Sequence, residues 1–460
     1  MKHKVKQIHF IGIGGVGMSG IAEVLHNLGY KVSGSDIATN GNIERLLQQG
    51  IDVFIGHDKS NIGNSDVIVT STAIQDDNPE LIASVGSGRT IVPRAMMLAE
   101  LMRFKYGIAI AGAHGKTTTT SLCAETLRQC GLDPTFIIGG KLAVTESNAT
   151  LGAGDYLVAE ADESDASFLY LNPLIAVVTN IDLDHMDTYD HDENKLKQAF
   201  IDFLHRLPFY GRAILCHEDE RVREIIPLIK RPVVTYGFSE DCSIYARDVR
   251  AVGEQMHFTV CVTEDSLEYP MILNLHGVHN VLNALSVIAV ALECEGKIED
   301  IATGLASFHG VGRRCQHYPN IVFDSKEALL IDDYGHHPNE LKATIAALRG
   351  AYPGRKMILI FQPHRYTRTR DLFDDFTSVL SNVDEVIVLE VYAAGEKPIP
   401  LADGRSLVRG IRLHGNQNAV FANDLEEAKT ILFNVLQHND LVVTMGAGSI
   451  GKLPQMLLSN

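Results

Sequence analysis

The chain has 460 residues, 45% of them hydrophobic and 21% charged, and carries a formal net charge of −17. This length allows roughly three domains of ~100 to 200 residues with sizeable cores, and the composition is ordinary for a globular protein, which excludes a disulfide-stapled miniprotein and a largely disordered chain. The acidic balance argues against a general footprint for nucleic acid or for an anionic membrane, so any anionic ligand must be held by local donors.

Short apolar runs alternate with helical periodicity over the first hundred residues, which is the βαβ pattern of a parallel sheet. Strands are predicted at Gln7–Ile11, Lys31–Val32 and Val67–Thr70, with a helix reaching to about Leu28. The same rhythm restarts further along the chain, at residues 108–111, 156–161, 329–332, 357–361, 385–389 and 441–444. Residues 244–275 instead show β-rich alternation. We therefore predict an α/β protein of three tandem domains, with boundaries near residues 107 and 315.

The first predicted strand runs into a GxGxxG turn, and Asp36 stands at the end of the second strand. In such a turn, backbone N–H groups at a helix N-terminus can approach a diphosphate, while the acid can take a ribose hydroxyl. The turn predicts phosphate binding through Gly12, Gly14, Gly15, Val16 and Gly17. A dinucleotide-dependent oxidoreductase is one interpretation, and tight strand-to-helix packing without a ligand is another.

The strand at residues 108–111 leads into a second glycine loop, which ends in Lys116 and Thr117. A strand, a glycine loop, a lysine and a threonine that open a helix form the context of a P-loop: amides hold phosphate, the lysine neutralises it and the hydroxyl reaches Mg²⁺. The loop is shorter than the general pattern, which would place glycine at Ile110. We predict an exposed Lys116 in a phosphate site that consists of Gly112, Ala113, His114, Gly115, Lys116, Thr117 and Thr118.

Polar clusters follow the next two predicted strands, at residues 160–165 and 179–185. Ligands of open α/β sheets bind at the carboxyl ends of strands, and acids there are suited to hold Mg²⁺ against a triphosphate. Solvated loop charges with capping roles are the alternative for either cluster alone. The neighbouring P-loop pattern favours the metal site.

Each of two later motifs can be explained either by ligand binding or by a structural role. Asn280 and Asn283 are three residues apart on a predicted helix, so their amides can converge on a ligand such as an adenine edge; a helix N-cap at Asn280 is the alternative. The pair Arg313 and Arg314 can clamp a phosphate or only meet surface charges.

Histidines 336 and 337 follow the strand at residues 329–332. An adjacent pair suggests a metal, but neighbouring side chains on one strand point to opposite faces, so His336 and His337 need not share a ligand.

A cationic segment follows the strand at Met357–Phe361, with His364, Arg365, Arg368 and Arg370. Guanidinium groups match carboxylate or phosphate with two donors, although surface arginines in a helix-terminal loop are the alternative. A second GxGxxG at residues 446–451 is interpreted as a structural turn.

The motifs at residues 12–17, 112–117, 180–185, 279–283 and 332–338 together resemble the Mur ligase family across essentially the whole chain. The resemblance implies a Rossmann-like domain at residues 1–107 for a UDP-sugar, a central P-loop ATPase-type domain at 108–314, and a C-terminal Rossmann-like domain at 315–460 for ATP and an amino acid. Within the family, residues 362–368 resemble the member that uses L-alanine. A ligase that recycles murein tripeptide is a near neighbour and remains an alternative.

The resemblance also implies a reaction in peptidoglycan precursor synthesis. The lactyl carboxylate of UDP-N-acetylmuramate takes the γ-phosphoryl group of ATP, and the amine of L-alanine attacks the acyl phosphate, giving an amide, ADP and phosphate. Because both the carboxylate and ATP are anions, cations must neutralise and align them, which suits Lys116, Mg²⁺ and the arginines. An oxidoreductase would leave the Lys116 loop unexplained.

The residue roles implied by the resemblance fall into five groups. The metal ligands are Thr117, Glu160 and His185, and because imidazole suits Mn²⁺ better than Mg²⁺, Mn²⁺ is an alternative ion. Besides the phosphate loop, the ATP-binding residues are Asn280, Asn283, Arg314 and Asp333. The UDP-sugar-binding residues are Gly12, Gly14, Gly15, Val16, Gly17 and Asp36. The amino-acid-binding residues are Tyr334, His336, Arg365 and Arg368. The catalytic residues are Lys116, His185, His336, Arg365 and Arg368.

The sequence also indicates a compartment. Seven cysteines are scattered without CxxC spacing, as is typical of reduced thiols in a cytosol, and no segment approaches ~18 uncharged apolar residues. We expect a cytoplasmic protein that binds small molecules but neither nucleic acid nor membrane, as a monomer or weak homodimer.

Overall fold

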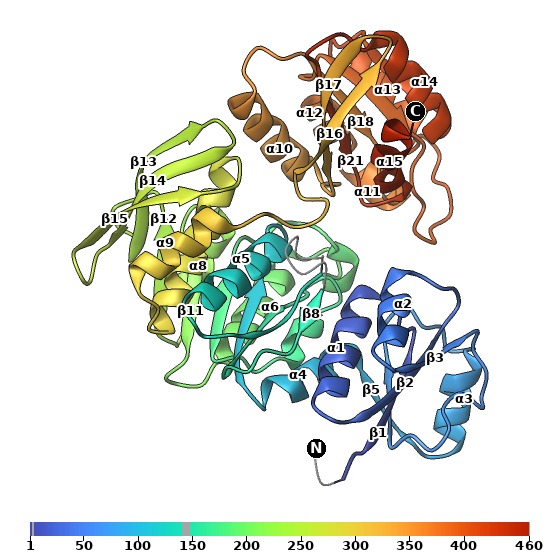
Figure 1. Cartoon of the computed structure of the whole chain (residues 1–460), viewed down its shortest axis with the longest axis vertical. Coiled ribbons are helices and arrows are strands. Elements are labelled where there is room, and N and C mark those ends of the chain that lie inside the picture. The colour runs from blue at the N-terminus through green and yellow to red at the C-terminus, as the bar shows by residue number, and fades with distance from the viewer. Residues whose placement is uncertain (2–3, 140–147, 460) are drawn as a thin grey trace. The chain divides into compact units, whose positions relative to one another are not determined.

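The structure is a computed structural model that describes residue 1 and residues 4–139 and 148–459. Within those residues, three sheets of five, ten and six strands follow one another along the chain (Figure 1). The chain divides into two compact units by its internal contacts. The first consists of Met1–Val249, His257–Leu273 and Asn280–His309, and the second of Arg250–Met256, Asn274–His279 and Gly310–Asn460.

The first sheet is parallel and has the strand order β3-β2-β1-β4-β5. Its strands are β1 (Gln7–Ile11), β2 (Lys31–Asp36), β3 (Asp52–Ile55), β4 (Val67–Thr70) and β5 (Thr90–Pro93). Its helices are α1 (Val16–Asn27), α2 (Gly41–Gln48), α3 (Pro79–Gly86) and α4 (Arg94–Met102). Because the chain continues from β1 to one side and later returns to β4 on the other, the strand order reverses beside β1, the point where open α/β sheets bind ligands.

The second sheet has the order β15-β14-β13-β12-β11-β10-β6-β9-β7-β8. Its parallel part consists of β13 (Ile244–Val252), β12 (Val233–Gly237), β11 (Arg212–Cys216), β10 (Ile175–Val178), β6 (Tyr106–Ala111), β9 (Tyr156–Glu160) and β7 (Thr135–Ile137). The rest consists of β8 (Ala149–Thr150), β14 (Gln255–Val262) and β15 (Leu267–Leu273). The β-rich segment predicted for residues 244–275 is confirmed.

The helices of this region include α5 (Lys116–Gln129), α6 (Glu193–His205), α7 (Glu220–Ile225), α8 (Val278–Glu293) and α9 (Ile298–Ser307). Strand β6 lies between β9 and β10, so the loops that leave the carboxyl ends of these three strands meet at one edge. Those loops carry the predicted phosphate loop and both predicted acidic clusters. The strand order therefore brings three separate sequence motifs together.

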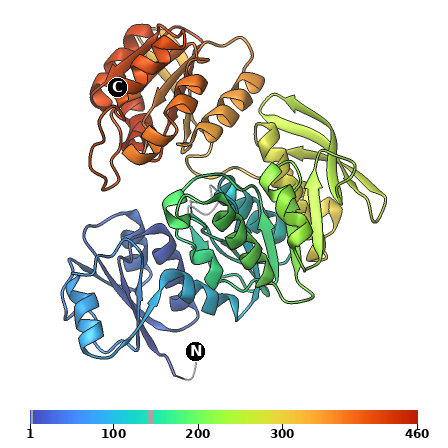
Figure 2. The ribbon, with the colours of Figure 1, turned by 180° about the vertical axis from the view of Figure 1, so that it is seen from behind.

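The third sheet has the order β16-β17-β21-β18-β19-β20, and only the β16–β17 pair is antiparallel. Its strands are β16 (Gln316–Phe323), β17 (Lys326–Asp333), β18 (Met357–Phe361), β19 (Glu385–Leu389), β20 (Ala419–Ala422) and β21 (Leu441–Met445). Its helices are α10 (Pro338–Ala351), α11 (Tyr366–Asp371), α12 (Phe373–Leu380), α13 (Gly404–Leu413), α14 (Leu425–Val435) and α15 (Leu453–Leu458), which flank the sheet in Figure 2.

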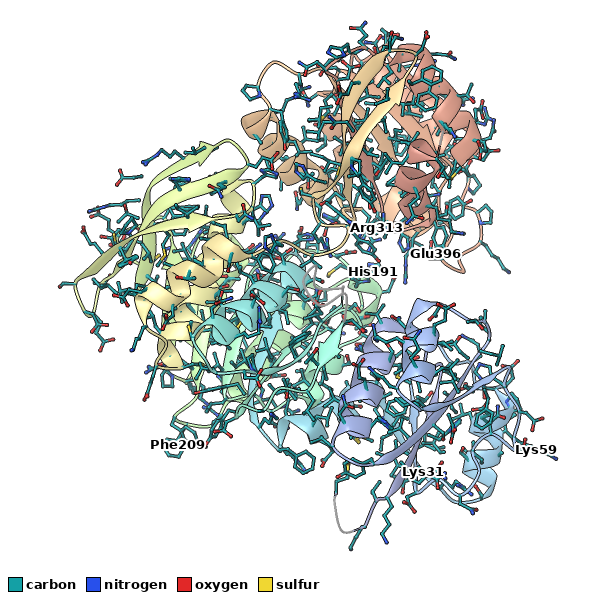
Figure 3. All side chains as sticks on the ribbon, in the orientation of Figure 1. Lys31, Lys59, His191, Phe209, Arg313 and Glu396 are labelled. Atoms are coloured by element: carbon teal, nitrogen blue, oxygen red, sulfur yellow. The ribbon has the colours of Figure 1, made fainter. Side chains whose placement is uncertain are left out.

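Buried apolar side chains explain why these runs form strands: every residue of β18 and of β21 is buried, as expected of parallel strands covered on both faces. Polar side chains such as Lys31 and Lys59 are exposed (Figure 3). Among the described residues, no helix is long and apolar enough to cross a bilayer.

Candidate functional site

The glycine turn after β1 is held by the acid at the end of β2. Gly12 has φ +81°, and the Gly14 N–H donates to Asp36 Oδ2 at 2.8 Å. A Cβ on Gly14 would lie 2.8 Å from Asn40 Nδ2 and 2.9 Å from Asp36 Oδ2. Asp36 also accepts from the N–H of Ile37. The carboxylate thus shapes the turn, and its contact with a ribose stays a prediction.

An arginine that the sequence analysis missed lies beside this turn. Arg94 is the first residue of α4, directly after β5, and its guanidinium would meet a Cβ on Gly17 at 2.7 Å. The same guanidinium pairs with Asp162 of the first acidic cluster at 3.4 Å. Its place at a strand's carboxyl end was the available signal. Arg94 therefore links the glycine turn to the acidic loop after β9.

The second glycine loop, after β6, is a tight turn whose two glycines have positive φ. Gly112 has φ +130°, and a Cβ there would lie 2.1 Å from Thr179 Oγ1. Gly115, with φ +83°, precedes α5, and a Cβ there would lie 2.8 Å from Asn283 Oδ1. A side chain fits at neither position, so the two glycines allow the backbone to approach the loop after β10 and the start of α8.

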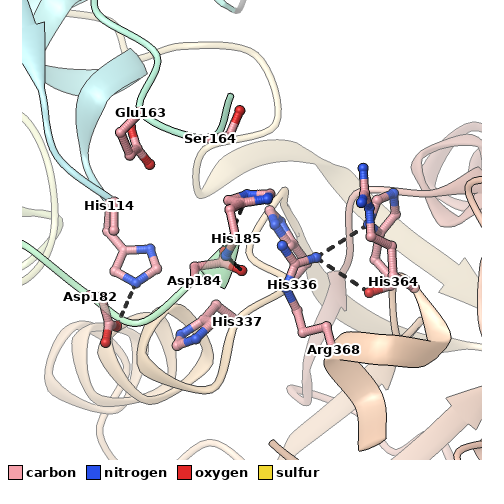
Figure 4. Close-up of polar contacts among 12 residues, drawn as sticks. His114, Glu163, Ser164, Asp182, Asp184, His185, His336, His337, His364 and Arg368 are labelled. Atoms are coloured by element: carbon pink, nitrogen blue, oxygen red, sulfur yellow. Dashed lines mark hydrogen bonds and ion pairs between the residues drawn. The ribbon is translucent and has the colours of Figure 1, made fainter. Parts of the chain in front are cut away.

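His114 is fixed between these glycines by the second polar cluster. Its N–H donates to Asn180 Oδ1 at 2.8 Å, and its carbonyl oxygen accepts from Thr179 Oγ1 at 2.7 Å and Asn180 Nδ2 at 3.0 Å. Its ring Nε2 lies 2.9 Å from Asp182 Oδ2 (Figure 4). The cluster after β10 therefore braces the phosphate loop, a role that the sequence analysis did not foresee.

Lys116 forms an ion pair with Glu163. Its Nζ donates to Glu163 Oε1 at 2.9 Å and Oε2 at 2.8 Å, to the Gly112 carbonyl at 2.5 Å and to the Ala113 carbonyl at 3.2 Å. The expectation of an exposed lysine is wrong, because the side chain of Lys116 is only 17% exposed and that of Glu163 only 6%. Burial opposes the ammonium charge, but the carboxylates of Glu163 and Asp162 raise the pKa of Lys116 above its ordinary value.

Oxygen donors suited to a hard cation lie on the elements around this lysine. Glu160, the last residue of β9, accepts from the Gly139 N–H at 2.6 Å, and Thr117 is buried in the first turn of α5. His185 has φ +55°, and its Nε2 lies 3.5 Å from Asp184 Oδ2. Carboxylate and hydroxyl oxygens fit Mg²⁺, whereas the imidazole fits Mn²⁺ better.

The two asparagines of α8 share one buried surface. Asn283 Nδ2 donates to Asn280 Oδ1 at 3.0 Å. The alternative of an N-cap at Asn280 is wrong, because α8 already begins at Val278. Since Asn283 also lies against Gly115, both amides lie near the phosphate loop, and their contact with adenine stays a prediction.

In the second unit, the neighbouring residues Arg313 and Arg314 make different contacts. Arg313 Nε donates to Asp332 Oδ2 at 2.7 Å, and its NH2 group donates to the Gly446 carbonyl at 2.6 Å. Arg314, the predicted ATP ligand, lies with its Cζ 5.0 Å from the ring centroid of Tyr334. Arg313 therefore ties β17 to the turn after β21, which supports a structural role for the second GxGxxG turn.

Asp333 holds the backbone at the end of β17. Its Oδ2 accepts from the Cys315 N–H at 2.8 Å and its Oδ1 from the Gly335 N–H at 2.7 Å. Its contact with ATP stays a prediction.

The adjacent histidines do not lie on a strand, contrary to our interpretation, because β17 ends at Asp333. His337 is the N-cap of α10, and the Glu340 carboxylate accepts from the N–H groups of His336 and His337. Their separate environments follow from this cap rather than from strand alternation. The ring of His336 lies 5.6 Å from that of His364.

The three arginines of the cationic segment after β18 lie in different environments. Arg368 is 7% exposed, and its NH1 group lies 3.3 Å from the carbonyl oxygen of His364 (Figure 4). Arg365 has φ +70° and a side chain 44% exposed, whereas Arg370 pairs with Asp371 at 2.6 Å. Burial, His336 and Arg368 lower the pKa of His364 to about 4, so His364, which the sequence analysis included in the cationic segment, is a neutral imidazole at neutral pH.

Three family models match consecutive parts of the chain. The Mur ligase family catalytic domain matches residues 7–106, the Mur ligase middle domain 110–291, and the Mur ligase glutamate ligase domain 313–448. The UDP-N-acetylmuramate–L-alanine ligase of Chromobacterium violaceum is 59% identical over 456 residues, covering 99% of this chain and 98% of that protein. The corresponding ligase of Neisseria meningitidis serogroup C is 57% identical over 462 residues, covering 100% and 99%.

Solved structures share the architecture. The UDP-N-acetylmuramate-alanine ligase of Thermotoga maritima aligns with a TM-score of 0.82 at 27% identity and covers 98% of both chains. A murein peptide ligase of Psychrobacter arcticus aligns with a TM-score of 0.73 at 22% identity over 98% of both chains, and so shares the fold. The predicted three-domain α/β fold is confirmed.

Proposed function

The chain belongs to the Mur ligase family, and from this premise we propose that it joins L-alanine to UDP-N-acetylmuramate in a reaction driven by ATP. Full-length relatives with 57–59% identity carry the name of that ligase. The structural observation that carries the proposal is the glycine loop with Lys116 at the sheet edge where the two acidic loops after β9 and β10 also begin.

The reaction begins with attack of the lactyl carboxylate on the γ-phosphorus of ATP, which releases ADP and forms an acyl phosphate. The amine of L-alanine then attacks the acyl carbon, the amide forms, and phosphate leaves with one carboxylate oxygen. Both reactants of the first step are anions, so their approach needs local positive charge. Lys116 supplies it, because neighbouring carboxylates keep its ammonium protonated.

Thr117 and Glu160 would hold Mg²⁺ in this site, with His185 as a further ligand better suited to Mn²⁺. The fit rests on the donor set: Thr117 places a buried hydroxyl in the first turn of α5, and Glu160 places a carboxylate at the end of β9. When bound, the ion would neutralise phosphate charge. Lys116 still has its own task, since it offers N–H donors at a position that the glycine loop determines.

The C-terminal residues act on the amino acid. Arg365 and Arg368 bind the alanine carboxylate, and the paired donors of a guanidinium match its two oxygens. Tyr334 and His336 border the same region, with His336 beside His364. Arg368 is the stronger candidate of the two arginines, because it is buried and held through His364.

The small-molecule partners follow from this reaction: UDP-N-acetylmuramate on the first glycine turn, ATP on the phosphate loop, and L-alanine in the C-terminal unit. We place the reaction in the cytoplasm, and we propose a monomer or weak homodimer. The limits of the three functional domains, residues 1–107, 108–314 and 315–460, remain part of the proposal.

Phosphate release from ATP tests the proposal. It must require Mg²⁺, UDP-N-acetylmuramate and L-alanine together. If murein tripeptide replaces alanine with a higher kcat/KM, the recycling ligase is the correct function. If no combination of these substrates releases phosphate while a nicotinamide cofactor is turned over, the oxidoreductase is correct.

A further inference from the structure

Four acceptors surround the ammonium of Lys116. Two are the oxygens of the Glu163 carboxylate, at 2.8 and 2.9 Å, and two are the carbonyl oxygens of Gly112 and Ala113, at 2.5 and 3.2 Å. An ammonium group has three N–H donors. All of its donor capacity is therefore used within the protein.

A phosphate oxygen can reach this ammonium only if one of the present acceptors leaves. The two carbonyl groups belong to the glycine loop, which is fixed because Gly112 packs against Thr179 and the backbone of Asn180. Glu163 differs, because its carboxylate is at the end of a side chain that rotates about single bonds. It is therefore the acceptor that can be exchanged.

Repulsion between the Glu163 carboxylate and a nucleotide phosphate makes this exchange necessary. A carboxylate and a phosphate repel each other at short distance in a site with little water, and the Glu163 side chain is only 6% exposed. Asp162 and Glu160 add negative charge that acts on the same lysine. The nucleotide phosphate thus competes with Glu163 for one cation.

We propose that Glu163 determines the nucleotide affinity of this enzyme: its carboxylate occupies Lys116 when no nucleotide is bound and must be displaced by the phosphates of ATP. The inference rests on the proposed function, because it assumes that the loop binds ATP. Its consequence is that part of the binding free energy of every nucleotide is used to break the ion pair. Glu163 thereby weakens binding of ADP as well as ATP and favours product release.

The variant Glu163→Gln tests the proposal by isothermal titration with ADP and with ATP, each with Mg²⁺. It removes the charge of the competing group and keeps its shape. A hydrogen bond to a charged group corresponds to about a tenfold effect or more in an equilibrium constant, so both dissociation constants should fall by about that factor. Glu163→Asp keeps the charge on a shorter side chain and should lower them less.

Glu125→Gln is the matched control. Glu125 on α5 is equally buried, with a side chain 6% exposed, and it also forms an ion pair, with the half-exposed Arg128 at 2.6 Å, but this partner is not in the glycine loop. The nucleotide affinity of the Glu125→Gln variant should therefore equal that of the wild type. A melting temperature measured without nucleotide shows whether each variant folds, and if Glu163→Gln does not, the smaller change in Glu163→Asp decides.

The possible results separate the two claims. Unchanged or weaker binding by folded Glu163→Gln would overturn the proposal, and weaker binding would show that Glu163 orients the lysine for phosphate. If the wild-type enzyme binds neither nucleotide, the proposed function itself fails.

Discussion

Glu163 and Lys116, 47 positions apart in the sequence, form a buried ion pair with N–O distances of 2.8 and 2.9 Å. Removing one partner of such a pair leaves the other charge buried and uncompensated, which costs about 3–5 kcal/mol. We therefore expect Lys116 to stabilise the fold in addition to its proposed role in binding phosphate. A loss of activity on its removal has two causes that must be separated.

The double variant separates them. We expect Lys116→Met to abolish phosphate release and to lower the free energy of unfolding by about 3 kcal/mol or more. Lys116→Met combined with Glu163→Gln should regain most of that stability and none of the activity, because no charge remains unpaired. Urea unfolding and the phosphate-release assay measure the two effects. A single Lys116→Met variant with wild-type stability would contradict the ion pair.

Gly112→Ala should disrupt the phosphate loop. At φ +130° an alanine is strained, and its Cβ would lie 2.1 Å from Thr179 Oγ1. We expect a lower melting temperature and loss of ATP binding. The matched control is Gly131→Ala, where φ is +76° but nothing lies within 4 Å of the added Cβ, so the cost should be only the about 1–2 kcal/mol of a left-handed backbone, and ATP should still bind. Equal effects of both substitutions on ATP binding would refute the tight loop.

The arginines after β18 should differ in importance. Lysine keeps the charge but loses the paired planar donors, so Arg368→Lys should lower kcat/KM for alanine by about ten- to a hundredfold. Arg365→Lys should have a smaller effect because its side chain is more exposed. Arg370→Lys serves as the control, because Arg370 pairs with Asp371 on the surface. Wild-type alanine kinetics in Arg368→Lys would remove that residue from the site.

His276 should make the protein sensitive to acid. Burial and the neighbouring His317 lower its pKa from 6.5 to about 4 in the folded state. Between those values the unfolded chain binds more protons than the folded chain, so the free energy of unfolding falls as the pH falls. His276→Gln should reduce the loss of melting temperature between pH 6.5 and about 4, whereas substitution of the exposed His309 should not. Parallel pH profiles for wild type and His276→Gln would contradict this.

The sequence predicted the elements whose signal is local. Strands β1, β4, β18 and β19 lie where the apolar runs predicted them, because a buried parallel strand is a short continuous apolar segment. The motifs that carry the family resemblance are also local signals. The glycine turns, for example, keep a fixed spacing because their backbone conformation depends on it.

Contacts between distant residues could not be predicted in this way. The pairing of Lys116 with Glu163 and the position of Arg94 beside Gly17 depend on strand order, which no local pattern encodes. The strand alternation applied to His336 and His337 failed because both residues lie beyond the end of β17 at Asp333, where a helix cap forms. The environments of His336 and His337 could therefore be assigned only from the structure.

Oxygen transfer tests the central claim most directly. UDP-N-acetylmuramate labelled with ¹⁸O in both oxygens of its lactyl carboxylate would be incubated with the enzyme, ATP, Mg²⁺ and L-alanine, and the inorganic phosphate analysed by mass spectrometry. If the carboxylate attacks the γ-phosphorus and the amine then displaces phosphate, each phosphate must carry one ¹⁸O atom, and the product must be the alanine amide. Unlabelled phosphate would show that ATP is hydrolysed by water without an acyl phosphate, and would contradict the proposed ligase mechanism.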